Sequence, residues 1–438
     1  MAAKGTADFA TSILALFMLA AGLYAQAGDV AGTGGRDAAG GAHGPYLILV
    51  SIDGFSSDYR SIYATPALDR IAASGVQAES LRPVFPSLTF PNHYSIATGL
   101  YPSEHGIVSN RFPDETRGNW YKLSDRSSVE DGRWYGGEPI WVAAEKHGLV
   151  SAAYYFVGTE AAIQGVRPSH WNSFDASVPG SDRVARVVEW LQWPQERRPR
   201  LITLYFEHVD TVGHDFGRGS PELAQAVAEV DANIGRLLDA IAELGLAGEV
   251  NVLVVSDHGQ ANYVDPERSF VLREHVDLAG LEIISGGAYA WIYQQQPDRE
   301  EALAIRDAIN ENWSHGRAVL RDEAPAEWRV TDSPRYPEIF VVPDVGYGVI
   351  VEREGLAWMT KADHGWEPSD QAMHGIFLGT GPGLPVGMTI GEISAVNIYP
   401  LMLDLLRIEA PPPPPDRDRL RSMLRGEDRS AGRTPTLR

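Results

Sequence analysis

The sequence predicts an α/β protein, a three-layer α/β/α sandwich with a mostly parallel central sheet and a smaller α+β insertion. Three continuous apolar runs, Tyr46–Ile52, Leu201–Phe206 and Val250–Val255, are rich in β-branched residues. Such runs are typical of strands buried on both faces of a parallel sheet. Helical patterns lie between them, for example at 66–73 and 221–244. Strands that alternate with helices favour a sheet covered by helices on both faces.

The catalytic domain is expected to span residues 45–410, with the insertion at about 260–361. Within the insertion the pattern changes to short strands around one helix, and the expected segments are 288–293, 299–313, 338–342 and 348–351. The chain then returns to the main domain with a strand at 372–378 and a closing helix at Ile398–Leu406.

The N-terminus has the features of an export signal. Lys4 precedes an apolar run at 13–23, and Ala25-Gln26-Ala27 forms a small-x-small cleavage pattern. We therefore expect a cleaved signal peptide at 1–27 and a periplasmic or secreted protein. The run is short for a membrane span, so no stable membrane insertion is expected. A buried helix and a membrane anchor are the alternatives, and Asp8 argues against a signal peptide.

Two further segments have compositions that do not support a packed core. Residues 28–44 are rich in Gly and Ala and are interpreted as a linker. Residues 411–438 begin with five prolines, continue with many arginines and contain few apolar residues, so a disordered tail is predicted.

The overall composition limits the chemistry. The 438 residues carry a formal charge of −21, which argues against a nucleic-acid polymer as a partner. A small anionic substrate fits if metal ions supply positive charge locally. The chain has no cysteine, which excludes disulfides, thiolate zinc sites and cysteine nucleophiles. Any zinc must therefore be held by His and Asp. Nothing in the sequence indicates an oligomeric state.

Asp and His residues follow the predicted strands at several points. Each alone is ordinary, because an Asp after a strand is most often a helix cap or turn residue. Four separate segments, however, repeat this placement, and the carboxyl ends of parallel strands form a common ligand crevice. Asp and His also suit zinc. The sequence thus predicts a metal site formed by Asp53, Asp210, His214, Asp257, His258 and His364.

A nucleophile is expected near these ligands. The segment 85–93 (FPSLTFPNH) precedes a helix of small residues predicted at 94–99. A hydroxyl at a helix N-terminus faces the positive end of the dipole, where a phosphate also binds favourably. Thr89 and Ser87 are both candidates, and the alternative interpretation is that either one caps the helix.

These motifs together resemble a known family. The combination LVSIDGF, FPSLTFPNHYSIATGLYPSEHGIVSN, YFEHVDTVGHDFG, VVSDHG and DHGW, followed by MHGIFLGTGP, is similar to the nucleotide pyrophosphatase/phosphodiesterase family of the alkaline phosphatase superfamily. The resemblance runs from about residue 46 to residue 406. The absence of cysteine and of accessory domains makes the chain similar to the compact bacterial form.

The resemblance implies two Zn²⁺ ions and a threonine nucleophile. One ion would be held by Asp53, Thr89, Asp257 and His258, and the other by Asp210, His214 and His364. Thr89 rather than Ser87 would be the nucleophile and would form a covalent intermediate. The implied activity is the hydrolysis of phosphodiester or pyrophosphate bonds of nucleotides, with release of nucleoside 5′-monophosphate.

The expected substrate contacts lie near this nucleophile. The resemblance implies that Asn110 binds a phosphate oxygen and that Phe90 and Tyr205 hold the nucleobase, although both rings could instead be ordinary core residues. Asn172 is a further candidate contact from the residues alone. His374 falls outside the ligand set and is interpreted as structural.

Several rival functions fit parts of the same pattern. A neutral Asn110 suits a diester better than the arginine a monoesterase would use, which argues against an alkaline phosphatase-type monoesterase. A phospholipid- or choline-ester phosphodiesterase stays open, because the Trp-, Tyr- and Asp-rich segment 113–138 could hold a quaternary ammonium. A metal-binding exported protein without turnover is disfavoured by the intact Thr89. Sulfatase chemistry is disfavoured because the expected cysteine and arginine are absent.

Overall fold

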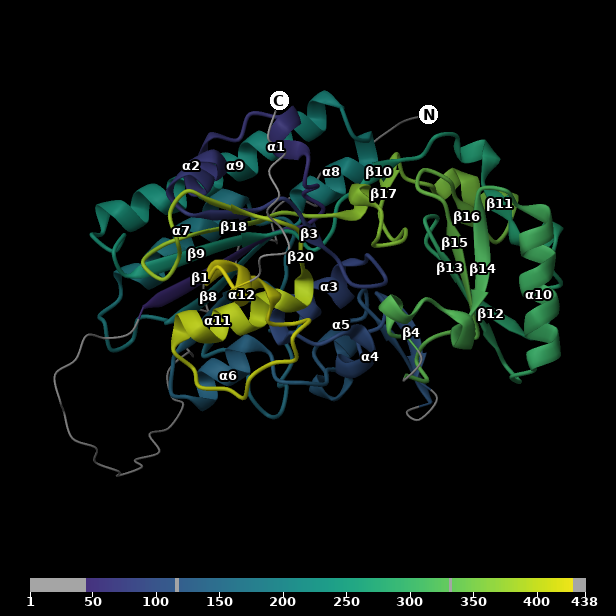
Figure 1. Ribbon diagram of the computed structural model, residues 1–438, viewed down its shortest axis with the longest axis horizontal. Helices are drawn as coiled ribbons and strands as arrows, with labels where there is room; N and C mark the ends of the chain where they lie inside the picture. Colours follow the sequence, from purple (N-terminus) through teal and green to yellow (C-terminus); the bar gives the residue numbers. More distant parts are fainter. Residues whose placement is uncertain (1–44, 115–117, 331–332, 428–438) are drawn as a thin grey trace, which may run out of the picture. The chain divides into compact units, whose positions relative to one another are not determined.

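The computed structural model describes residues 45–114, 118–330 and 333–427. Its main element is an eight-stranded sheet with the strand order β19-β2-β18-β9-β1-β8-β6-β7 (Figure 1). The strands are β1 (Tyr46–Ile52), β2 (Val76–Ala78), β6 (Ser151–Tyr154), β7 (His170–Trp171), β8 (Leu201–Phe206), β9 (Val250–Val255), β18 (Phe377–Thr380) and β19 (Met388–Ile390).

The sheet is mostly parallel, as the sequence predicts. Strand β1 pairs in parallel with β8 on one side and with β9 on the other, and Ser51 lies opposite both Tyr205 and Val255. Only β18 among these strands runs antiparallel to its neighbours, β9 and β2. Because β1, β8 and β9 end at the same level, the loops that follow them meet at one edge of the sheet.

Helices cover both faces of this sheet (Figure 1). Leu47 and Leu49 of β1 belong to the core under one layer of helices, and Ile48 and Val50 belong to the core under the other. This two-sided burial explains why the strand is a continuous apolar run. The first layer includes α6 (Ile140–Lys146) and α11 (Ile398–Leu406), and the second includes α2 (Pro66–Ser74), α7 (Gly180–Gln192) and α9 (Pro221–Glu243).

The insertion forms a smaller α+β unit with its own apolar core. Its four-stranded antiparallel sheet has the order β12-β13-β15-β14, and α10 packs on this sheet. The elements are β12 (Leu281–Ser285), β13 (Ala290–Gln294), α10 (Arg299–Asn312), β14 (Gly316–Leu320) and β15 (Ile339–Pro343). Smaller strands on this side are β11 (Phe270–Val271) and β16 (Val349–Ile350), which pair with each other.

The two ends of the insertion lie side by side. Strand β10 (Ala261–Asn262) pairs with β17 (Ala362–Asp363) in an antiparallel ladder. The chain therefore leaves the main domain directly after Gln260 and returns directly before His364. This pairing places His364 beside the loop that follows β9.

The remaining described elements are short, apart from the ten-residue helix α3 (Thr89–Thr98). The short helices are α1 (Tyr59–Ile62), α4 (Pro102–His105), α5 (Arg126–Val129), α8 (His208–Phe216) and α12 (Arg419–Leu424). The short strands are β3 (Leu81–Arg82), β4 (Arg111–Asp114), β5 (Asn119–Lys122) and β20 (Ile393–Ser394).

Three local predictions differ from the structure. The helix expected at 94–99 begins earlier, at Thr89. The strand expected at 372–378 begins only at Phe377, because residues 371–373 form a 3₁₀ turn. The tail expected to be disordered includes α12, whose Leu420 and Met423 are buried against the main domain. These two apolar residues, three positions apart, form a helical face that the Pro- and Arg-rich composition conceals.

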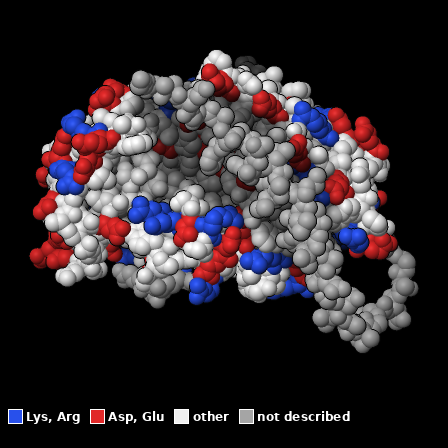
Figure 2. Space-filling view, turned by 180° about the vertical axis from the view of Figure 1, so that it is seen from behind, with Lys and Arg blue, Asp and Glu red and all other residues white. Residues whose placement is uncertain are grey.

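The segments expected to be a signal peptide and a linker, 1–27 and 28–44, lie outside the described residues. Within residues 45–114, 118–330 and 333–427, no helix is both long and apolar enough to cross a membrane. On the described part of the face in Figure 2, acidic and basic side chains are interspersed rather than gathered into one basic field.

Candidate metal centre and active site

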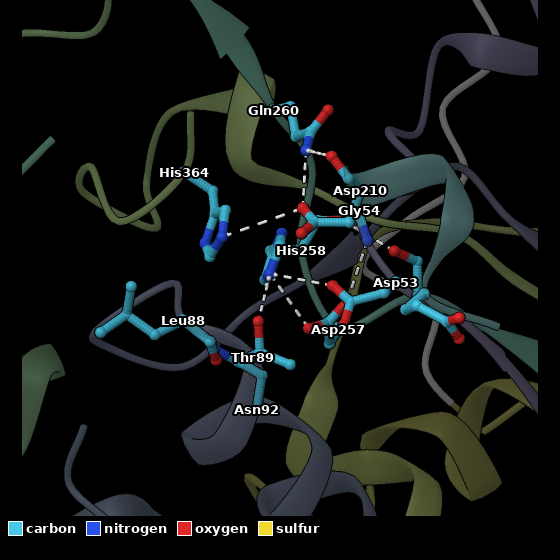
Figure 3. A network of polar contacts seen from close by, with 12 residues as sticks. Asp53, Gly54, Leu88, Thr89, Asn92, Asp210, Asp257, His258, Gln260 and His364 are labelled. Atoms are coloured by element: carbon cyan, nitrogen blue, oxygen red, sulfur yellow. Dashed lines mark hydrogen bonds and ion pairs between the residues drawn. The ribbon is translucent and has the colours of Figure 1, made fainter. Parts of the chain in front are cut away.

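Most of the predicted Asp and His residues are seen to converge at the edge where β1, β8 and β9 end (Figure 3), namely Asp53, Asp210, Asp257, His258 and His364. Asp53 follows β1 directly, and Asp257 and His258 follow β9. Helix α8, which follows β8, carries Asp210 and His214. His364 enters from β17 at the end of the insertion. The structure therefore brings together all six residues that the strand-end pattern selects.

Gly54 allows α8 to approach this edge closely. Its backbone is left-handed, with φ at +66°, and a Cβ at this position would lie 2.7 Å from Asp210 Oδ1. A larger residue would be strained in this conformation and would also displace the Asp210 carboxylate. The glycine of the SIDGF segment is thus required by the geometry of the site.

One half of the cluster surrounds His258. Its Nε2 lies 3.0 Å from Asp257 Oδ2 and 3.4 Å from Asp53 Oδ1. Thr89 Oγ1 lies 3.3 Å from the same nitrogen. These four residues are the set that the family resemblance assigns to one metal ion.

The other half of the cluster surrounds Asp210. Asp210 Oδ2 is 3.3 Å from His214 Nε2, and Asp210 Oδ1 is 3.8 Å from His364 Nε2. The His364 ring stacks on the His258 ring with 3.6 Å between centroids. The two halves therefore adjoin each other.

Backbone carbonyls fix the orientation of the three histidines. The Nδ1 atoms of His214, His258 and His364 lie 2.9, 3.1 and 2.8 Å from the carbonyl oxygens of Ala362, Gly259 and Ser87, respectively. A carbonyl oxygen can only accept, so Nδ1 carries the hydrogen. In the neutral ring each Nε2 then presents a lone pair to the cluster, which is the arrangement found at metal-ligating histidines.

The electrostatics of the cluster also fit bound cations. Asp53 Oδ1 and Asp257 Oδ2 are buried and accept no hydrogen bond from the described residues. Burial, and then the neighbouring carboxylates of Asp257 and Asp210, raise the pKa of Asp53 well above its usual value. Burial and the adjacent His258 lower the pKa of His364 to about 3, so this ring is neutral and able to ligate. Divalent cations would offset the cost of these buried carboxylates.

The structure distinguishes between the two candidate hydroxyls. Ser87 is fully buried, and its hydroxyl donates a hydrogen bond to the carbonyl of Trp366, away from the cluster. Thr89 is partly exposed, and its hydroxyl faces His258. Neither side chain caps the helix, because Leu88 occupies the N-cap position of α3. Of the two, only Thr89 is therefore placed to act on a substrate at the cluster.

Asn92 holds the loop that carries these hydroxyls. Its Oδ1 accepts a hydrogen bond from the Val84 backbone N–H at 2.7 Å. Its Nδ2 donates to the carbonyl oxygens of Pro86 and Leu88, each at 2.9 Å. The side chain is fully buried, and these bonds fix the turn that leads into Thr89.

Asn110 lies beside the nucleophile turn with its amide orientation fixed. Its Oδ1 accepts a hydrogen bond from the backbone N–H of Phe90 at 3.0 Å. The amide N–H groups make no hydrogen bond to the described part of the chain and are available to a substrate oxygen. Phe90 is partly exposed, and its ring lies 6.2 Å from that of Tyr121.

Tyr205 connects the expected base-binding region to the metal cluster. Its hydroxyl donates to Asp53 Oδ2 at 2.5 Å. Its partly exposed ring lies 6.1 Å from that of Phe174. Asn172 makes no described contact with the cluster and lies two residues before Phe174. Of the expected substrate residues, Asn172 is thus the one that the structure does not tie to the site.

Three buried polar residues at the site were not selected from the sequence. Gln260 donates from Nε2 to Asp210 Oδ1 at 2.6 Å. Asp363 accepts from the hydroxyl of Tyr263 at 2.7 Å and lies next to His364. His93 contacts Asp257. Their adjacency to the DHG, DHGW and TFPNH motifs was the available signal, but a buried polar residue is recognised only when its partner is known.

His374 lies apart from these metal-ligand groups, in agreement with its interpretation as structural. Its Nδ1 is 2.9 Å from the Ser80 hydroxyl, and its Nε2 is 3.0 Å from the carbonyl oxygen of Pro368. The ring belongs to none of the described clusters whose ligand atoms could share an ion.

Comparison with known families gives a match over most of the chain. The family described as type I phosphodiesterase / nucleotide pyrophosphatase matches residues 47–375. The human ectonucleotide pyrophosphatase/phosphodiesterase family member 1 is 30% identical over 84% of this chain and 40% of its own length. An uncharacterized pyrophosphatase/phosphodiesterase of Schizosaccharomyces pombe is 32% identical over 84% of this chain and 78% of its own length. This chain therefore spans less than half of the human relative.

Solved structures of the same kind share the fold. Murine ectonucleotide pyrophosphatase / phosphodiesterase 5 superposes with a TM-score of 0.78 at 28% identity, covering 84% of this chain and 96% of the murine one. An inactive threonine-to-alanine variant of that murine protein, solved in complex with AMP, matches with the same values. The alkaline phosphatase-like fold expected from the sequence is thereby confirmed.

Proposed function

The chain belongs to the type I phosphodiesterase / nucleotide pyrophosphatase family, and we propose that it hydrolyses phosphodiester or pyrophosphate bonds of nucleotides to release nucleoside 5′-monophosphate. The observation that carries this proposal is the Thr89 hydroxyl at the start of α3, 3.3 Å from His258 in a cluster of Asp and His side chains. The AMP complex of the murine neighbour supports a nucleotide as substrate. The inactivity of its threonine variant supports a threonine nucleophile.

Two divalent cations, proposed to be zinc, would occupy the cluster. Oxygen and imidazole donors without sulfur suit Zn²⁺, and two such ions match the two adjoining halves of the cluster. When bound, the ions would lower the pKa of the nucleophile and neutralise charge on the phosphoryl and leaving oxygens. The first site would consist of Asp53, Thr89, Asp257 and His258, and the second of Asp210, His214 and His364.

Thr89 is proposed to act in two displacements at phosphorus. Its oxygen first loses the hydroxyl hydrogen to solvent and forms a bond to phosphorus while the bond to the leaving oxygen breaks, which gives a phosphothreonine diester. Water then attacks the same phosphorus, the bond to Thr89 breaks and the hydroxyl is restored. In the first turn of α3 the Phe90 N–H already donates to Asn110 Oδ1 and Pro91 has no N–H, so the phosphoryl oxygens are proposed to be bound by the Asn110 amide rather than by the helix terminus.

Asn110 is proposed to select diesters over monoesters. Its amide N–H groups, oriented by the bond from Phe90 N–H to Oδ1, can donate to a nonbridging phosphate oxygen. A diester carries one fewer negative oxygen than a monoester, so a neutral donor suits the diester. Phe90 and Tyr205 are proposed to hold the nucleobase, because both rings are partly exposed beside the nucleophile turn.

A panel of three aryl esters tests this function. With zinc supplied, we expect kcat/KM for a nitrophenyl nucleoside monophosphate to exceed that for nitrophenyl phosphate and nitrophenyl choline phosphate by about a hundredfold or more, since the base contacts and Asn110 act together. Steady-state kinetics with each ester give these ratios. Preference for the monoester would contradict the diesterase proposal, and preference for the choline ester would contradict the nucleotide proposal.

Replacing Phe90 with alanine extends the same panel. The variant should raise KM for the nucleotide ester about tenfold, because one face of the base loses its stacking partner. A simple aryl methyl phosphate diester, which has no base, is the matched control and should change little. Equal losses for both substrates would contradict the base-binding role.

A further inference from the structure

His93 joins the nucleophile turn, a metal-ligand candidate and the central strand. It is fully buried on α3, four residues after Thr89. Its Nδ1 lies 2.9 Å from the Thr89 carbonyl oxygen and 3.2 Å from Asp257 Oδ2. Its Nε2 lies 2.8 Å from the hydroxyl of Ser51 in β1. The family resemblance assigns no role to this residue.

The hydrogen positions on the ring follow from its neighbours. The Thr89 carbonyl is an acceptor, so Nδ1 carries the hydrogen that bonds to it, and the Asp257 carboxylate lies in ion-pair contact with the same nitrogen. In the neutral ring, Nε2 accepts a hydrogen bond from the Ser51 hydroxyl. The rings of Phe156 and Tyr205 each lie edge-on to the imidazole at 5.2 Å between centroids. The imidazole is therefore held in one orientation.

The Asp257 carboxylate depends on this contact. Its Oδ1 accepts only a long bond, 3.2 Å, from the Gly54 backbone N–H. Its Oδ2 lies between His93 Nδ1 at 3.2 Å and His258 Nε2 at 3.0 Å. When His258 Nε2 is directed at a cation, the Nδ1–H of His93 stays in ion-pair contact with Oδ2. Without it, the long bond from the Gly54 N–H would be the main contact that orients the carboxylate.

We propose that His93 is a positioning residue that fixes the Asp257 carboxylate to the first turn of α3. This role rests on the function proposed above. The link between His93 and Asp257 sets the spacing between the Thr89 hydroxyl and the cation that Asp257 would hold. Because Nδ1–H contacts both the Thr89 carbonyl and Asp257, a displacement of either is passed to the other. The Ser51 contact only holds the far side of the ring.

Two substitutions separate the two ring nitrogens. In His93→Asn, the side-chain amide occupies about the position of Nδ1 and can still donate towards Asp257. In His93→Gln, the amide reaches about the position of Nε2 and leaves no donor near Asp257. Ser51→Ala is the matched control, because it removes only the partner of Nε2. All three proteins are compared with wild type as zinc-loaded full-length chains.

We expect His93→Gln to lower kcat by about ten- to a hundredfold, with KM for the nucleotide ester nearly unchanged. The variant should also lose one of two bound zinc ions at a lower chelator concentration than wild type. His93→Asn should retain kcat and zinc within about tenfold of wild type, and Ser51→Ala within about threefold. Melting temperatures monitor folding. Zinc retention does not require turnover, so a wild-type protein inactive on nucleotides would contradict the proposed function while leaving this test intact.

Three outcomes would overturn the positioning role. The first is that His93→Gln and wild type have equal zinc retention and equal kcat. The second is that His93→Asn and His93→Gln lose equally at matched melting temperatures. The third is that Ser51→Ala loses as much as His93→Gln. If His93→Gln does not fold, kcat of the soluble His93→Asn protein tests the proposal. This variant retains the donor, so a loss of more than about a hundredfold in its kcat would contradict the proposal.

Discussion

Replacement of Thr89 with alanine is expected to lower kcat for a nucleotide ester by more than about a thousandfold, because the covalent step would be lost and Ser87, the other candidate hydroxyl, points away from the cluster. The fold should persist, since Thr89 is partly exposed and caps no helix. Metal content should stay close to two ions per chain, because Asp53, Asp257 and His258 remain in the site. Steady-state kinetics and elemental analysis of the purified protein check both expectations.

Ser87→Ala is the matched control for this prediction. Ser87 lies two residues away in the same loop, but its hydroxyl bonds to the Trp366 carbonyl. Its removal should cost about 1 kcal/mol of stability and less than about tenfold in kcat. If Thr89→Ala retained turnover while Ser87→Ala abolished it, the nucleophile would be Ser87 and the role proposed for Thr89 would be wrong.

Removal of the metal ions is expected to abolish turnover and to lower the melting temperature by about 5 °C or more. Without cations, the buried carboxylates of Asp53, Asp257 and Asp210 repel one another, and burial raises the pKa of Asp53 well above its usual value. Bound ions stabilise only the folded state, in which these ligands converge. Dialysis against a chelator, followed by thermal unfolding and elemental analysis, measures the effect.

Re-addition of zinc should restore both activity and melting temperature at two ions per chain. A sample dialysed against chelator already saturated with zinc controls for effects of the chelator itself. Full activity in protein that contains less than a trace of any divalent metal would contradict metal-dependent hydrolysis. Restoration by a single ion per chain would contradict the two-ion arrangement.

The sequence predicted the main sheet well because burial on both faces leaves a local signature. Tyr46–Ile52 is apolar at every position except Ser51, and its alternate residues enter two different cores. The ligand cluster was predictable for a related reason, since parallel strands end at a common edge and Asp53, Asp257 and His258 follow two of those ends directly. The pattern of the chain alone therefore specified where the cluster lies.

Other features depended on contacts between distant residues. The choice between Thr89 and Ser87 rests in the structure on the bond from Ser87 to Trp366, 279 residues away, which no local pattern reveals. His93 and Gln260 are polar residues in buried positions, and their roles became visible only with Asp257 and Asp210 beside them. The buried face of α12 was missed because composition averaged over the tail conceals two apolar residues.

The stereochemical course at phosphorus tests the central claim, a covalent Thr89 intermediate, most directly. A nitrophenyl nucleoside phosphorothioate of known configuration would be hydrolysed in isotopically labelled water, and the configuration of the labelled product determined. Each in-line displacement inverts phosphorus, so attack by Thr89 followed by attack by water predicts net retention. Net inversion would mean that water attacks the substrate directly, and it would contradict a covalent role for Thr89.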